Sequence, residues 1–172
     1  MTQKSDFTPE AWRTLLMGPL ATNLYIIVAD PSVFGAIKES FALTKELADV
    51  QTDPNAPELL RFMVADLLDK DTVRDLMPDL KGHPETVRAR LRELIDAAVA
   101  QLNEKAAPEE SAEIRRWMLN LAERTASAAR EGGFLTIGSV RVSDQEKQAL
   151  AELAEILGVD AVLDERAQEE VE

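Results

Sequence analysis

The sequence predicts an all-α protein, a single-domain bundle of about seven helices. Its composition favours helix, because the chain has only 7 glycines in 172 residues, 5% aromatic residues and abundant alanine, leucine, glutamate and arginine. Apolar residues recur at steps of three and four through most of the chain, which is the periodicity of an amphipathic helix. A strand-like alternation occurs only in LTIGSVRV, residues 135–142, where Gly138 divides it.

The first helix is predicted to begin at Pro9, because Thr8 can cap its free N–H groups and proline costs nothing at the first helical position. Gly18 and Pro19 predict a kink or a break, after which Pro19 opens a second segment. No charged residue occurs from 14 to 29, but these 16 residues are fewer than the ~20 of a membrane-spanning helix. We therefore expect a buried core helix here and no membrane.

Start signals and breakers divide the middle of the chain. Asp30 is suited to cap a helix that opens at Pro31, and the breakers in QTDPNAP, residues 51–57, end it. The next helix opens at Pro57, and a short helical turn after it ends at Pro78. The apolar face predicted for the helix from Pro57 comprises Leu60, Met63, Val64, Leu67 and Leu68.

Three longer helices follow, each with an apolar stripe. Pro84 opens the first, with a stripe of Val87, Leu91, Leu94, Ala98 and Leu102. The second ends at Gly132 and has a stripe of Ile114, Met118, Leu121, Thr125 and Ala128. Ser143 and Glu146 form a capping-box pattern for the third, which buries Leu150, Leu153, Ala154 and Leu157. We expect residues 1–159 to form the globular domain and 160–172 to form an acidic C-terminal tail.

The charge of the chain excludes several kinds of partner. The formal net charge is −13, and residues 132–172 alone carry ten acids against three bases. Such a surface repels phosphate groups, so the sequence predicts no nucleic-acid partner and no anionic membrane partner. The chain has no cysteine, and its beginning lacks the pattern of a secretory signal, which together favour a cytoplasmic location.

Each familiar catalytic pattern fails on the residues. The glycine spacing of Gly133 and Gly138 resembles a phosphate-binding loop, but Ser139 stands where that loop needs lysine. His83 is the only histidine, so a two-histidine metal site within one chain is excluded. The acids of DLLDKDTVRD lack the glycine and glutamate of a calcium loop, so they are interpreted as a solvated face with helix-capping aspartates. No carboxylate pair stands out for acid–base chemistry, and the sequence predicts no catalytic residue and no cofactor.

Arginine and tryptophan residues suggest protein contacts. Arg88 and Arg92 are four residues apart on one predicted helix face and are expected to pair with the chain's own acids or with those of another subunit. Arg115 is interpreted in the same way. Trp12 lies near the N-terminus and is predicted to be an interface residue, since tryptophan is enriched at such contacts.

Two segments, LYIIVADPSVFGAIKE within residues 20–40 and GSVRVSDQEKQALAELAEILGV within 138–159, resemble helix junctions of the tellurite-resistance TerB-like family of bacterial all-helical proteins. The resemblance implies an all-helical fold, a divalent metal ion and a role in stress responses. Asp30 and Glu146 stand at positions that match the family's acidic metal ligands, and Asp144 is a further candidate ligand beside them. Pro31 replaces the family's turn glycine, which predicts a degraded site.

The best interpretation of the sequence is a non-catalytic interaction or self-association module. Nearly every predicted helix has a wide apolar stripe, which one copy of a chain this size does not fully cover. We therefore expect a homo-oligomer or a complex with another protein. The alternative is a TerB-like, divalent-metal-responsive stress protein.

Overall fold

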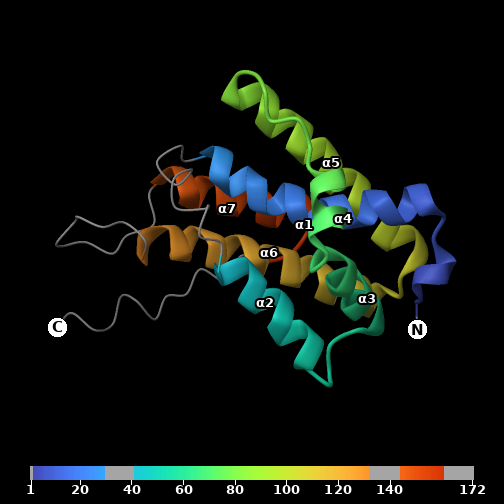
Figure 1. Ribbon diagram of the computed structural model, residues 1–172. Helices are drawn as coiled ribbons and strands as arrows, with labels where there is room; N and C mark the ends of the chain where they lie inside the picture. The colour runs from blue at the N-terminus through green and yellow to red at the C-terminus, as the bar shows by residue number, and fades with distance from the viewer. Residues whose placement is uncertain (1, 30–40, 132–143, 161–172) are drawn as a thin grey trace.

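Seven α-helices and one short 3₁₀ turn make up the part of the chain that this computed structural model describes, residues 2–29, 41–131 and 144–160 (Figure 1). No strand occurs in those ranges, so the all-α prediction is confirmed. The elements are η1 (Lys4–Asp6), α1 (Pro9–Ala29), α2 (Phe41–Thr52), α3 (Glu58–Leu67), α4 (Lys70–Leu76), α5 (Pro84–Lys105), α6 (Pro108–Glu131) and α7 (Asp144–Leu157).

Helix α1 lies at the centre of the bundle. It packs against α5, α6 and α7 and also touches α4, while α2 packs against α3 and α6 (Figure 1). Because neighbours surround it, α1 is uncharged on every side after Arg13, and its buried residues include Leu15, Leu16, Ile26 and Ile27. The prediction of a buried core helix in this segment is confirmed. None of the described helices is long and apolar enough to cross a membrane.

Helix α1 continues through Pro19, so the predicted break and the separate segment opening at this residue are wrong, while the alternative of a kink stays a prediction. Proline removes one backbone hydrogen bond, which breaks an isolated helix, but packing on all sides holds this one together. Gly18 allows that packing, since a Cβ atom there would lie 2.6 Å from the Cβ of Ala98 on α5. The hydroxyl of Thr22 also donates a hydrogen bond to the carbonyl of Gly18 at 2.9 Å.

Two of the predicted start signals, Thr8 and Pro84, hold in the structure. The N–H of Ala11 donates to the hydroxyl of Thr8 at 3.2 Å, so Thr8 caps α1. Pro84 occupies the first turn of α5, as predicted. The remaining predicted helix-end residues, Asp30, Gly132 and Ser143, lie outside the described residues, as does the tail beyond residue 160.

The predicted apolar stripes are confirmed in α7 and need correction in α3 and α5. Leu150, Leu153, Ala154 and Leu157 are all buried. In α5 Ile95, which was not predicted, is fully buried, whereas the predicted Leu94 is only partly buried. At the end of α3 the predicted core residue Leu68 is 41% exposed.

Candidate functional site

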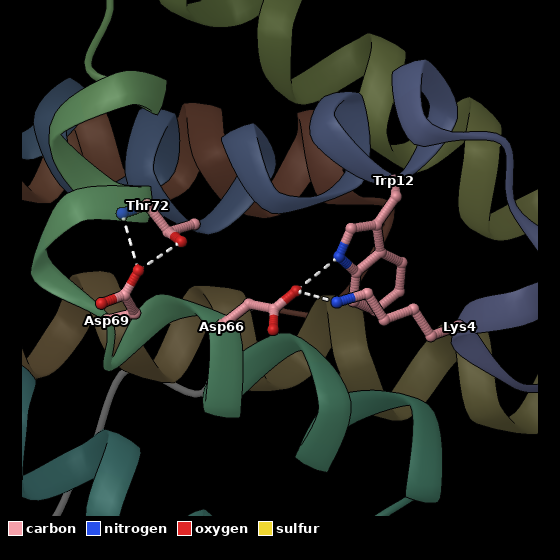
Figure 2. A network of polar contacts seen from close by, with 5 residues as sticks. All are labelled: Lys4, Trp12, Asp66, Asp69 and Thr72. Carbon is pink, nitrogen blue, oxygen red and sulfur yellow. Dashed lines mark hydrogen bonds and ion pairs between the residues drawn. The ribbon is translucent and has the colours of Figure 1, made fainter.

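Trp12, the predicted interface residue, is anchored within its own chain (Figure 2). Its indole N–H donates to Asp66 Oδ2 at 2.7 Å, and the ammonium group of Lys4 reaches the same oxygen at 2.6 Å. Lys4 also lies 5.3 Å from the centre of the indole ring, and Phe7 packs against that ring. Only 7% of Trp12 is exposed, so nearly all of its surface is buried within its own chain, and its hydrogen bond to Asp66 links α1 to α3. An interface role for the small remainder stays a prediction.

Two of the acids in DLLDKDTVRD, Asp66 and Asp69, form hydrogen bonds with different partners. Asp66 holds Trp12, while Asp69 caps α4 by accepting hydrogen bonds from the N–H of Thr72 at 3.0 Å and from its hydroxyl at 2.7 Å (Figure 2). These bonds from Thr72 place the pKa of Asp69 below its ordinary value. The prediction of helix-capping aspartates is confirmed for Asp69.

The predicted metal ligands are only partly described. Asp30 lies outside the described residues. Glu146 is 3% exposed in the first turn of α7, and Asp144 is an exposed carboxylate 3.9 Å from Lys147. Within the described ranges no three histidine, aspartate or glutamate residues come together in a way that could hold a metal ion. The divalent-metal site stays a prediction, and a saturable gain of thermal stability with one cation in moderate salt would support it.

A polar cluster joins α1, α5 and α7. Arg88 forms an ion pair with Glu152, and the hydroxyl of Tyr25 donates to Glu152 Oε2 at 2.6 Å. The guanidinium of Arg88 lies 4.8 Å from the centre of the Tyr25 ring and donates to its hydroxyl at 3.2 Å. The prediction that Arg88 pairs with an acid of its own chain is confirmed. Because each partner comes from a different helix, the cluster fixes how these helices pack.

The cluster shifts two pKa values in opposite directions. Burial raises the pKa of Tyr25, and its hydrogen bond to Glu152 acts in the same direction. Burial also acts to raise the pKa of Glu152, but hydrogen bonds from Tyr25 and Gln148 and the charge of Arg88 outweigh it, so this pKa is lowered. The folded chain therefore favours an ionised Glu152 beside a neutral Tyr25.

These shifts predict a loss of stability in acid. A carboxylate whose pKa is lowered by folding stabilises the fold above its unfolded pKa, here near 4.5, and this stabilisation is lost as the pH falls through the lower folded value. Urea unfolding at a series of pH values should show a shallower acid loss for Glu152→Gln than for the original chain. Glu85→Gln is the control, because this nearby carboxylate is 88% exposed. Equal acid slopes in all three chains would contradict the role of Glu152.

The hydrogen-bond partners of Arg115 differ from the acidic partners that the sequence predicts. Its guanidinium donates to the backbone carbonyl of Leu157 at 2.8 Å and to that of Ser111 at 3.2 Å. These partners are carbonyls rather than carboxylates, and Leu157 is the last residue of α7. Arg115 therefore satisfies the free carbonyl end of α7 and ties that helix to α6.

An apolar hollow of about 480 Å³ opens between α1, α2, α3, α4 and α6. Its floor consists of the buried side chains of Leu20, Leu47, Leu67 and Leu121. Its rim includes two of the large apolar side chains that the fold leaves exposed, Leu68 at 41% and Met77 at 48%, and the cationic side chains of Lys70 and Arg74. None of the described lining residues is an acid. Sequence reasoning missed the hollow, because its walls come from five helices that are distant in the chain.

No family model, no curated protein and no solved structure matches this chain. The interpretation of the candidate site therefore depends on its geometry alone. The hollow can bind apolar groups, and its rim can attract negative charge.

Proposed function

We propose that the protein is a non-catalytic interaction module and that copies of the chain associate through the face of α4. The observation that carries this proposal is the exposure of Leu68 and Met77, two large apolar residues that both line the apolar hollow. Apolar surface of this kind, rimmed by polar residues, is typical of contact sites on folded proteins.

The charges of α4 suit a contact with a second copy. The helix carries two bases, Lys70 and Arg74, and two acids, Asp71 and Asp75. In a two-fold symmetric contact the same helix lies on both sides, so Arg74 can face the partner's Asp71 while the partner's Arg74 faces Asp71. Within one chain Arg74 already pairs with Asp71 at 2.9 Å, but both side chains are more than 70% exposed. Such an exposed pair contributes only about 0–1 kcal/mol and exchanges readily for a contact between subunits.

The net charge of −13 opposes this association over longer distances. Added salt screens the repulsion between two acidic chains, since the screening length falls to about 8 Å at physiological ionic strength. The apolar contact is little affected by moderate salt. Association should therefore strengthen when salt is raised from low to physiological concentration.

Sedimentation velocity over a range of protein concentrations tests the proposal. We expect a reversible dimer, and Met77→Glu should weaken it about tenfold or more, because a charge replaces an apolar group at the centre of the contact. Phe62→Glu is the matched control, since Phe62 is 36% exposed on α3 and does not line the hollow. A chain that stays monomeric at every concentration, or equal losses in both variants, would contradict the proposal.

A further inference from the structure

We propose that the apolar hollow is a binding site for an amphiphile with a single hydrocarbon chain and an anionic head group. This inference goes beyond self-association and does not depend on it. It stands on the volume of the hollow, the burial of its floor and the position of two cations on its rim.

The hollow has the size and lining of a small-molecule site. Its volume of about 480 Å³ falls within the range of roughly 300–1,000 Å³ that such sites occupy. Leu20, Leu47, Leu67 and Leu121 on its floor are each at most 9% exposed. Of the described lining residues only Asn23, Lys70 and Arg74 are polar or charged, and the Oδ1 of Asn23 already accepts a hydrogen bond from Thr125 at 2.6 Å. The interior therefore suits a hydrocarbon chain.

The two cations stand on one side of the opening. Lys70 and Arg74 are four residues apart, so they lie one above the other on the same face of α4. Lys70 forms no ion pair with any described residue, and the partners of Arg74 are exposed aspartates that hold it weakly. Both cations are therefore available to an anionic head group while its tail occupies the hollow.

The net negative charge of the chain allows specific binding at the hollow to be distinguished from non-specific binding. A net charge of −13 attracts cationic amphiphiles and repels anionic ones wherever binding is non-specific. Preference for an anionic head at this site requires the local charges of Lys70 and Arg74. A preference for anionic over cationic head groups would therefore indicate binding at the rim rather than non-specific hydrophobic binding.

Isothermal titration calorimetry with dodecanoate below its micelle concentration is the primary test. We expect saturable binding of one dodecanoate per chain, tighter than that of dodecyltrimethylammonium or dodecanol. Dodecyl phosphate, in a parallel titration, distinguishes a carboxylate preference from a phosphate preference. Absence of saturable binding of either anion, or tighter binding of the cationic probe, would overturn the proposal.

Variants locate the site. Lys70→Gln combined with Arg74→Gln should weaken dodecanoate binding about tenfold and leave dodecanol binding unchanged, because charge-assisted hydrogen bonds are lost from the head group alone. Lys147→Gln combined with Arg92→Gln removes the same two charges at exposed positions away from the hollow and should change neither affinity. Equal weakening by both pairs of substitutions would overturn the assignment to the rim.

Val73→Phe tests the hollow itself. Val73 is a half-buried lining residue on α4, so a larger side chain can fill the opening without entering the buried core. Binding of dodecanoate and of dodecanol should both fall, while circular dichroism confirms the helical fold. Unchanged binding of both probes would overturn the site.

The two proposals fail separately. Both proposals use the rim of the hollow on α4, so calorimetry is performed at concentrations where sedimentation shows only the monomer. A strictly monomeric chain that binds dodecanoate would contradict association and support this inference. A chain that dimerises at higher concentration but binds no anionic amphiphile as a monomer would do the opposite.

Discussion

Gly18→Ala should lower the free energy of unfolding by about 1–3 kcal/mol, although alanine is favoured over glycine inside a helix by roughly 0.5–1 kcal/mol. The added Cβ would lie 2.6 Å from the Cβ of Ala98 and 3.0 Å from the Cε of Met118. The flexible side chain of Met118 can move its Cε away, but the Cβ of Ala98 can move only if the backbone of α5 moves. The two helices must therefore separate. Urea unfolding followed by circular dichroism measures the loss. If the dependence of the unfolding free energy on urea concentration is unchanged, the shift in midpoint reflects a change in stability.

A double-mutant cycle identifies the cause. Ala98→Gly alone should cost about 1 kcal/mol through helix propensity. Combined with Gly18→Ala, it moves the single methyl group from α5 to α1 and restores the room between them. The double variant should therefore be more stable than the sum of the two losses predicts, by about 1–3 kcal/mol. Additive losses, or a gain of stability from Gly18→Ala alone, would contradict the close approach of α1 and α5.

Ile95→Ala should cost about 2–5 kcal/mol, which is the second large effect that we expect. Ile95 is fully buried in the middle of α5, the helix that contacts α1 most extensively. Truncation there removes three carbon atoms from a site closed on all sides and leaves a cavity. Thermal unfolding should show a midpoint lowered by about 2–4 °C for each kcal/mol lost.

Leu94→Ala is the matched control, because it removes the same number of carbon atoms from the adjacent residue. Leu94 is only partly buried, so its truncation exposes a shallow depression that water can fill. We expect a cost of about 1 kcal/mol or less. If Leu94→Ala were the more harmful of the two, α5 would present to α1 the stripe that the sequence predicts rather than the one in the structure.

The prediction of the helices succeeded because their signals are local. A cap such as Thr8 or Asp69 depends on an N–H group three residues away, and Pro84 depends only on its own fixed backbone angle. Composition and charge are likewise properties of the chain alone. From these the all-α class and the presence of a helix-capping aspartate within DLLDKDTVRD could be predicted.

The hollow and the polar contacts between helices could not be predicted in the same way, since their residues come from distant segments. Asp66 is separated from Trp12 by 54 positions, and Glu152 from Tyr25 by 127. Leu94 and Ile95 both fit a helical stripe, and only the direction from which α1 approaches α5 decides which one is buried. The spacing of apolar residues does not predict that direction, because it depends on how all the helices pack.

The amino-acid sequence by itself determined the all-α class of this protein, the start residues Thr8, Asp69 and Pro84 and the acidic charge of −13, because each depends on residues within about one helical turn or on composition alone. The tertiary structure decided that α1 continues through Pro19, since neighbouring helices compensate for the hydrogen bond that proline removes. It also decided where the hollow opens and which apolar side chains remain exposed. These features depend on the packing of helices that are far apart in the chain, and that packing is a property of the whole fold.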